Sequence, residues 1–247
     1  VEHTWTISAN KVNQLRFGYT SRGFDRSALH IPTYDIVGLQ QLGPAAGGDA
    51  EFMPSVTQAV ENLSWLRGRH SMKMGADLRM ERLNILQPPS PRGSFQFTNI
   101  MTSGLSAAGT AAAGTGTSFA SFLLGQVQNF SIDIQREVLR PRAQIAELFF
   151  QNDFKVTHRL MLNLGARYTL NFPSTVIGDR GAVFNLQTEK LDFLGKNGYP
   201  RGARNLEKLN FAPRLGLAFR VTDGMAVRSG YGLTWIEQAG ITTPFTT

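Results

Sequence analysis

The sequence contains no cysteine among its 247 residues. This absence excludes a disulfide framework, a zinc ribbon, an iron–sulfur cluster and thiol catalysis. Charged residues make up only 17%, against 42% hydrophobic residues, so the chain is too apolar for a disordered segment. No stretch approaches the roughly 18 apolar residues of a membrane-spanning helix, and no signal peptide follows Val1. Both termini look truncated, and we expect the chain to be a piece of a longer protein.

Acidic residues are outnumbered by basic ones, which gives a formal net charge of +7. Most of the basic residues are arginines, and they are scattered along the chain. Scattered guanidinium groups favour a solvated or lumen-lining role. An anionic partner such as phosphate, lipopolysaccharide or nucleic acid is the alternative, since the arginine fork fits phosphate and carboxylate.

Apolar and polar residues alternate with a period of two, which predicts β-strands with two different faces. In residues 160–170 and 71–81, the apolar positions include Met72, Met74, Leu78, Leu160, Leu162, Leu164 and Tyr168. The intervening positions include Lys73, Asp77, Arg79 and Arg167. Similar alternation over residues 1–8, 14–20, 55–66, 93–98, 130–138, 146–154, 214–221 and 225–235 predicts about ten strands.

Several of these strands span about 10–12 residues, whereas strands in soluble sheets usually have ~5–6 and a tilted strand that crosses a bilayer needs ~9–11. Short polar turns are predicted at residues 9–11, 67–69, 155–158 and 222–224, and long segments at 21–51 and 171–208. Short turns at one end and long loops at the other are the layout of an outer-membrane barrel. We therefore expect an all-β, antiparallel transmembrane barrel architecture.

The connection over residues 99–125 does not fit this layout. Counting strands places it at the short-turn end, yet it is long, and the count fails if residues 93–98 do not form a barrel strand. Residues 118–125 predict one or two helical turns with Ser118 as N-cap and Gly125 at C′.

Candidate chemistry is sparse. The histidines lie far apart, so no metal site is predicted, and a nucleophile elbow is absent. Carboxylate pairs at Asp77/Glu81 and Asp133/Glu137 could form an acid–base pair, but pairing with Lys73, Arg79 and Arg136 inside a lumen is the stronger interpretation. The aromatic residues, Phe149 and Phe150 among them, favour membrane-interface girdles over platforms for stacking nucleic-acid bases. We expect no enzyme activity, no cofactor and no nucleic-acid partner.

Four passages resemble the barrel of the Oar-like group of TonB-dependent outer-membrane receptors. They are residues 62–79, 118–125, 149–168, and 210–219 together with 228–232. The third is the most specific, and it departs from the Gln-Asp-Asp-Trp-Lys-Val-Thr hairpin of the family at Asn152 and Phe154. The resemblance implies a barrel of about 22 strands with a plugged lumen. Residues 1–247 would then be a partial barrel domain, without the plug domain, the TonB-contacting motif and the C-terminal strands.

The resemblance implies TonB-energised uptake, or receptor binding, of a bulky unidentified solute in the outer membrane of a Gram-negative-type bacterium. The partners would be lipid or lipopolysaccharide, the TonB complex and the protein's own plug domain. Residues expected to contact ligand or plug are Lys73, Asp77, Arg79, Arg167, Arg214 and Arg228; those expected to face lipid are Met72, Met74, Leu78, Leu160, Leu162, Leu164 and Tyr168. Two alternatives remain: a complete small barrel that acts as a passive pore or hydrolase, and a soluble basic β-protein that binds anionic polymers.

Overall fold

The computed structural model describes residues 1–45, 48–133 and 137–235. They form two compact units. The first, here called the strand unit, comprises residues 1–22, 53–83 and the described chain from residue 139 onward. The second, the loop unit, comprises residues 23–52 and the described part of 84–138.

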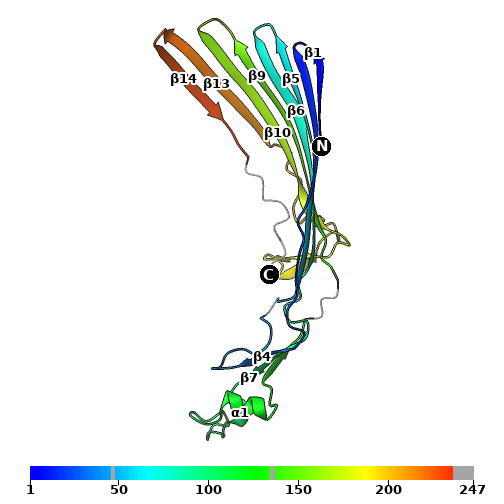
Figure 1. Ribbon diagram of the computed structural model, residues 1–247. Helices are drawn as coiled ribbons and strands as arrows, with labels where there is room; N and C mark the ends of the chain where they lie inside the picture. The colour runs from blue at the N-terminus through cyan, green and yellow to red at the C-terminus, as the bar shows by residue number, and fades with distance from the viewer. Residues whose placement is uncertain (46–47, 134–136, 236–247) are drawn as a thin grey trace. The chain divides into compact units, whose positions relative to one another are not determined.

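The main sheet has nine strands, and its principal order is β1-β2-β5-β6-β9-β10-β13-β14 (Figure 1). The strands are β1 (Glu2–Ser8), β2 (Lys11–Ser21), β5 (Ala50–Arg67), β6 (His70–Leu86), β9 (Pro141–Lys155), β10 (Leu160–Val176), β13 (Phe211–Thr222) and β14 (Met225–Gly232), with β3 (Phe24–Arg26) paired to β5. The predicted all-β antiparallel architecture is confirmed, with strands of up to 18 residues. The sheet is not closed, because β1 and β14 do not pair with each other in the described residues.

Consecutive strands of this order are joined alternately by tight turns and by long connections. The tight turns link β1 to β2, β5 to β6, β9 to β10 and β13 to β14. Gly68 in the second turn has a φ of 56°, the sign that the first position of a primed hairpin turn requires. In the third turn, Thr157 Oγ1 accepts hydrogen bonds from the backbone N–H groups of Arg159 (3.1 Å) and Leu160 (3.0 Å). The predicted alternation of short and long connections is therefore present.

Side chains join each tight turn to the next one along the sheet. Asn10 Nδ2 donates to the carbonyl oxygen of Leu66 at 2.9 Å, and Arg69 Nη1 donates to that of Val156 at 2.9 Å. Arg220 Nη2 donates to the carbonyl oxygen of His158 at 3.3 Å. Backbone bonds run beside these contacts, for example from Lys155 N to Arg69 O at 2.9 Å. The four turns thus form one hydrogen-bonded edge, here called the turn edge and defined as residues 8–11, 67–70, 155–160 and 220–225.

The connection between β10 and β13 belongs to the strand unit and contains a hairpin of β11 (Ala182–Asn185) and β12 (Lys190–Phe193). Arg204 Nη2 donates to the carbonyl oxygen of Asn171 at 3.2 Å, which holds this connection to β10. Buried hydrophobic residues gather at this end of the unit: Ala143, Ile145, Val176, Leu194 and Ala212. The long segment expected over residues 171–208 therefore contains regular structure, because β10 extends to Val176 and a hairpin follows.

The loop unit contains a three-stranded sheet of β4 (Thr33–Ile36), β7 (Ser94–Phe97) and β8 (Asn129–Ser131). β4 pairs with β7 in parallel, and β7 pairs with β8 in antiparallel fashion. The rings of Tyr34, Phe95, Phe97 and Phe122 pack together at centroid distances between 5.2 and 6.5 Å. Aromatic packing of this kind stabilises a small unit that has few strands.

The strands predicted over residues 93–98 and 130–138 were assigned to the barrel, and this assignment is wrong. β7 and β8 pair with each other and with β4, so the chain from Gln87 to Arg140 is one long connection between β6 and β9. As a result, the long connection over residues 99–125 no longer conflicts with the alternation of short turns and long loops. Ile134 and Arg136 lie outside the described residues.

The predicted helix is present as α1 (Ser118–Leu123), preceded by the short helix η1 (Ile100–Thr102). The N-cap is Thr117, whose side chain accepts from Ala120 N, so the predicted cap at Ser118 is one residue late. Gly125 follows the C-cap Leu124 with a φ of 68°, in agreement with its predicted C′ role. No helix in the described residues is long and apolar enough to span a membrane.

Candidate functional site

All six charged residues predicted to contact ligand or plug lie on one face of the main sheet. Residue pairs across the strands define this face, here called the charged face: Asp77 lies opposite Glu147, Arg167 opposite Ala212, and Arg214 opposite Gly165. Lys73 and Arg79 lie on β6 with the same parity as Asp77, and Arg228 lies on β14 opposite Ala218. Pairing and parity together therefore place the six on a common surface.

Two of the six meet around Glu147, a residue that the sequence analysis did not assign to the site. Glu147 lies opposite both Asp77 on β6 and Thr169 on β10. Its side chain is only 12% exposed, and its carboxylate accepts a hydrogen bond from Thr169 Oγ1 at 3.2 Å and lies 3.7 Å from Arg167 Nη1. Asp77 accepts two hydrogen bonds from Gln58 Nε2, at 2.9 and 2.7 Å. Two carboxylates on neighbouring strands are thus held by one guanidinium, one amide and one hydroxyl.

The hydrogen-bond donor to Asp77 is an amide, whereas Lys73 and Arg79 were the expected partners. Asp77 takes Gln58 as its hydrogen-bond donor, and Asp153 takes Asn163 and Gln151. Asp133 and Glu137 lie outside the main sheet, because the strand expected at 130–138 ends at Ser131. Since residues directly opposite each other on one face are the nearest neighbours in a sheet, register decides these partners, and register could not be derived from the sequence.

Three of the predicted cations have no hydrogen bond or ion pair with another described side chain: Lys73, Arg214 and Arg228. Arg214 lies opposite Gly232, and Arg228 lies opposite Ala218. These two arginines line a hollow on the charged face whose floor includes Gly216 and Gly230. Small residues between two guanidinium groups leave room for an anionic group.

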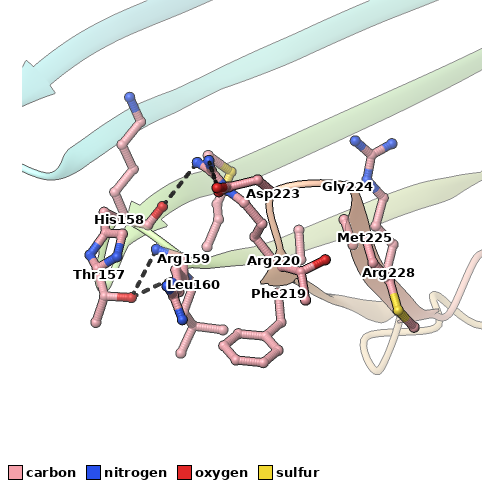
Figure 2. A pocket seen from close by; sticks show the side chains of 15 residues that line it. Thr157, His158, Arg159, Leu160, Phe219, Arg220, Asp223, Gly224, Met225 and Arg228 are labelled. Atoms are coloured by element: carbon pink, nitrogen blue, oxygen red, sulfur yellow. Dashed lines mark hydrogen bonds and ion pairs between the residues drawn. The ribbon is translucent and has the colours of Figure 1, made fainter.

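A second hollow adjoins the first at the turn edge, and Figure 2 shows the side chains that line it. Lys155, Arg159, Arg220 and Arg228 supply its positive charge, and Asp223 is the one carboxylate in its lining. Arg220 Nη1 lies 3.9 Å from Asp223 Oδ1, so this carboxylate forms an ion pair with an arginine of the same hollow. Residues 155–158 were missed as site residues because they were assigned to a turn, and Arg220 was missed although it was placed on a predicted strand.

The residues predicted to face lipid lie on the opposite face, here called the apolar face. Met72 and Met74 lie opposite Asn152 and Phe150 on β9, and Leu78 lies opposite Ala146. On β10, Leu160, Leu162 and Leu164 lie opposite Phe219, Leu217 and Leu215. Leu78 and Leu164 remain 52% and 37% exposed, so nothing in the described residues covers them fully.

Most of the aromatic residues singled out in the sequence follow this division into two faces. Tyr168 lies on the apolar face, and its hydroxyl donates to the carbonyl oxygen of Lys208 at 3.0 Å. Phe149, by contrast, lies on the charged face opposite Gly75, so the strand aromatics do not all face the same side of the sheet. A Cβ atom added to Gly75 would lie 2.9 Å from the Phe149 ring, so the ring covers a residue that has no side chain.

The charged face presents arginine side chains, and the described residues hold no cluster of metal-ligating side chains. No three histidine or carboxylate side chains gather as a cation would require, within residues 1–45, 48–133 and 137–235. Arginine presents a planar set of donors that suits phosphate and carboxylate groups. The arrangement thus favours recognition by charge.

A search of curated proteins finds no match to this chain. A family model described as an outer membrane beta barrel domain matches residues 1–246. The long antiparallel strands, the alternation of tight turns and long connections and the two contrasting faces agree with this match. The chain therefore belongs to the outer-membrane β-barrel domain family and is a protein of the outer membrane.

Proposed function

We propose that this chain forms part of the barrel wall of a TonB-dependent receptor of the Oar-like group, which takes up or binds a bulky solute. Its charged face would line the lumen and contact the solute or a plug domain, and its apolar face would contact lipid. The role would be binding and passage, with no catalytic step. Three of the four resembling passages support this, because each covers a hairpin of the main sheet: β5–β6, β9–β10 and β13–β14.

The observation that carries the proposal is the contrast between the two faces of the strands. Arg214 and Arg228 line an open hollow without a partner among the described residues, while Leu215 and Tyr231, on the same strands, are exposed on the other face. Exposed leucine and tyrosine side chains suit a hydrocarbon environment, and unpaired arginines suit an aqueous lumen that admits an anionic group.

Cysteine labelling tests this proposal, since the chain contains no cysteine of its own. Arg214→Cys would be placed in the native protein and labelled in cells with a bulky membrane-impermeant maleimide. Under the proposal, the labelling rate changes several-fold when the proton motive force is collapsed or the TonB partner is deleted, because energisation moves the plug. Leu215→Cys on the apolar face is the matched control and labels slowly in both states.

The alternatives predict different outcomes. In a small passive barrel, the maleimide would label Arg214→Cys at the same rate with and without the proton motive force. This result would overturn TonB dependence. A soluble anion-binding protein labels equally at both positions. Membership of an outer-membrane family favours the membrane interpretation over the soluble one.

A further inference from the structure

A cluster of one aromatic and two basic side chains lies on the apolar face at the turn edge. Lys11 and Trp65 are directly opposite each other on β2 and β5. The Lys11 ammonium lies 4.6 Å from the centroid of the Trp65 ring, and the Arg67 guanidinium carbon lies 5.5 Å from it. Both cations are thus held over one indole by cation–π attraction.

The apolar face, where lipid is expected, carries this cluster. Trp65 has the same parity on β5 as Ala59, which lies opposite Phe17, and as Leu63. Phe17 and Leu15 of β2 share this surface and are 52% and 49% exposed. Glu61 also lies on this face, between Ala59 and Leu63, and accepts a hydrogen bond from Asn13 Nδ2. Trp65 lies at the end of the strip nearest the turns, with Lys11 level with it and Arg67 beyond it.

The cations of the cluster have no anionic partner in the structure. Neither Lys11 nor Arg67 forms an ion pair with a carboxylate of any described residue. Around the turn edge the basic residues are Lys11, Arg67, Arg69, Lys155, Arg159 and Arg220, while Asp223 is the only acidic residue there. This edge therefore presents a strong excess of positive charge next to an apolar surface.

We propose that the Lys11–Trp65–Arg67 cluster binds the phosphate of an anionic phospholipid headgroup in the leaflet that meets the turn edge. Tryptophan is favoured at the level of the headgroups, and lysine and arginine extend their charges from an apolar surface toward the interface. Basic residues near a bilayer surface attract anionic lipid. A peptide or nucleic-acid partner fits less well, because the cluster adjoins exposed Leu15 and Phe17 on the same face.

This inference rests on the assignment of the apolar face to lipid in the proposed function. Brominated lipids, which quench tryptophan fluorescence on contact, can test the two separately. The chain has three tryptophans, so a Trp5→Phe/Trp235→Phe background leaves Trp65 as the only reporter. The protein would be reconstituted in equimolar phosphatidylcholine and phosphatidylglycerol vesicles, with bromine on one lipid at a time.

Brominated phosphatidylglycerol is expected to quench Trp65 about twofold or more better than brominated phosphatidylcholine, and high salt should reduce this ratio. In Lys11→Gln/Arg67→Gln the ratio should fall to about one while both lipids still quench, which shows that Trp65 stays embedded. The matched control, Lys190→Gln/Lys208→Gln, removes the same charge from the connection between β10 and β13 and should keep the original ratio.

Two results would contradict these statements in different ways. Equal quenching of the parent protein by the two lipids, or an unchanged ratio in the double glutamine variant, overturns the phospholipid site and leaves the membrane placement intact. Absence of quenching by either lipid shows that Trp65 is outside the bilayer, and it overturns the assignment of the apolar face itself.

Discussion

Leu164 lies on the apolar face of β10, between Asn152 of β9 and Leu215 of β13. An arginine at a lipid-facing position near the bilayer midplane costs about 2–4 kcal/mol of folding free energy. We expect Leu164→Arg to lose that amount in denaturant titrations of the bilayer-inserted protein. The neighbouring variant Asn163→Arg adds the same charge on the charged face opposite Asp153 and should cost far less. Equal losses in the two variants would mean that the faces are assigned wrongly.

Gly75 is the single glycine of β6, and the structure leaves little room for a side chain there. A Cβ atom there would lie 2.0 Å from the carbonyl oxygen of Glu61 and 2.9 Å from the ring of Phe149. Because the backbone must shift to admit it, Gly75→Ala should destabilise the fold by about 1–3 kcal/mol in equilibrium unfolding. Gly18→Ala is the control, since nothing lies within 4 Å of its added Cβ, and it should change stability little. Similar behaviour of the two variants would contradict the tight contact.

At the scale of elements, the hairpins of the main sheet could be predicted from the sequence, and the loop unit could not. Strands such as β10 alternate strictly, and a period of two assigns every side chain to a face before any partner is known. The segments at 93–98 and 129–131 alternate as well, but alternation carries no information about which strand is the neighbour. Parallel pairing of β4 with β7 joins residues about 60 positions apart, and only the tertiary fold determines it.

Asp49 in the loop unit should make the stability of that unit depend on pH. Its carboxylate accepts a hydrogen bond from the backbone N–H of Ala28 at 2.7 Å and pairs with Arg92. These contacts, the Ala28 hydrogen bond first, lower the pKa of Asp49 below its ordinary value of 3.8. A lowered pKa stabilises the folded state fully above the ordinary value, and the contribution is lost as the pH falls through the lowered pKa.

Hydrogen exchange can measure this effect. Asp49→Asn should reduce the protection of the Thr33 amide, which donates to Gly93 within the same unit, at neutral pH. The difference between parent and variant should shrink progressively below a pH of about 3.8. A difference that is constant down to a pH of about 2 would show that the charge of Asp49 does not stabilise the loop unit.

At the scale of the whole molecule, the edge strands β1 and β14 can distinguish a partial barrel wall from a complete small barrel. In a closed barrel of these strands, β1 and β14 would be neighbours, and some pairing of single cysteines across them would form an intrachain disulfide. We expect no intrachain crosslink in variants that combine Thr4→Cys with Arg228→Cys, Ser229→Cys or Gly230→Cys in the cell envelope. Thr4→Cys/Gln14→Cys is the positive control, because these residues lie opposite each other on β1 and β2. An intrachain β1–β14 crosslink, read by gel mobility, would support the small barrel.

The candidate site could be predicted in part. Parity alone grouped Lys73, Asp77 and Arg167 on the polar face, because each occupies a polar position in a strand where polar and apolar residues alternate. Glu147 and Gln58 were missed, since their importance comes from the register that places them beside Asp77 and Arg167. The basic hollow at the turn edge was missed for a related reason: Lys155 and Arg220 come together only when β9–β10 and β13–β14 lie side by side.

The hydrogen bonds from Asn10, Arg69 and Arg220 connect each tight turn to a carbonyl oxygen of the adjacent one. Asn10 and Arg69 donate toward the hairpin that follows in the sheet, whereas Arg220 donates toward the one that precedes it, so the β9–β10 turn accepts from both sides. A junction between neighbouring hairpins thus needs one donor side chain and one turn carbonyl, and the donor can belong to either hairpin.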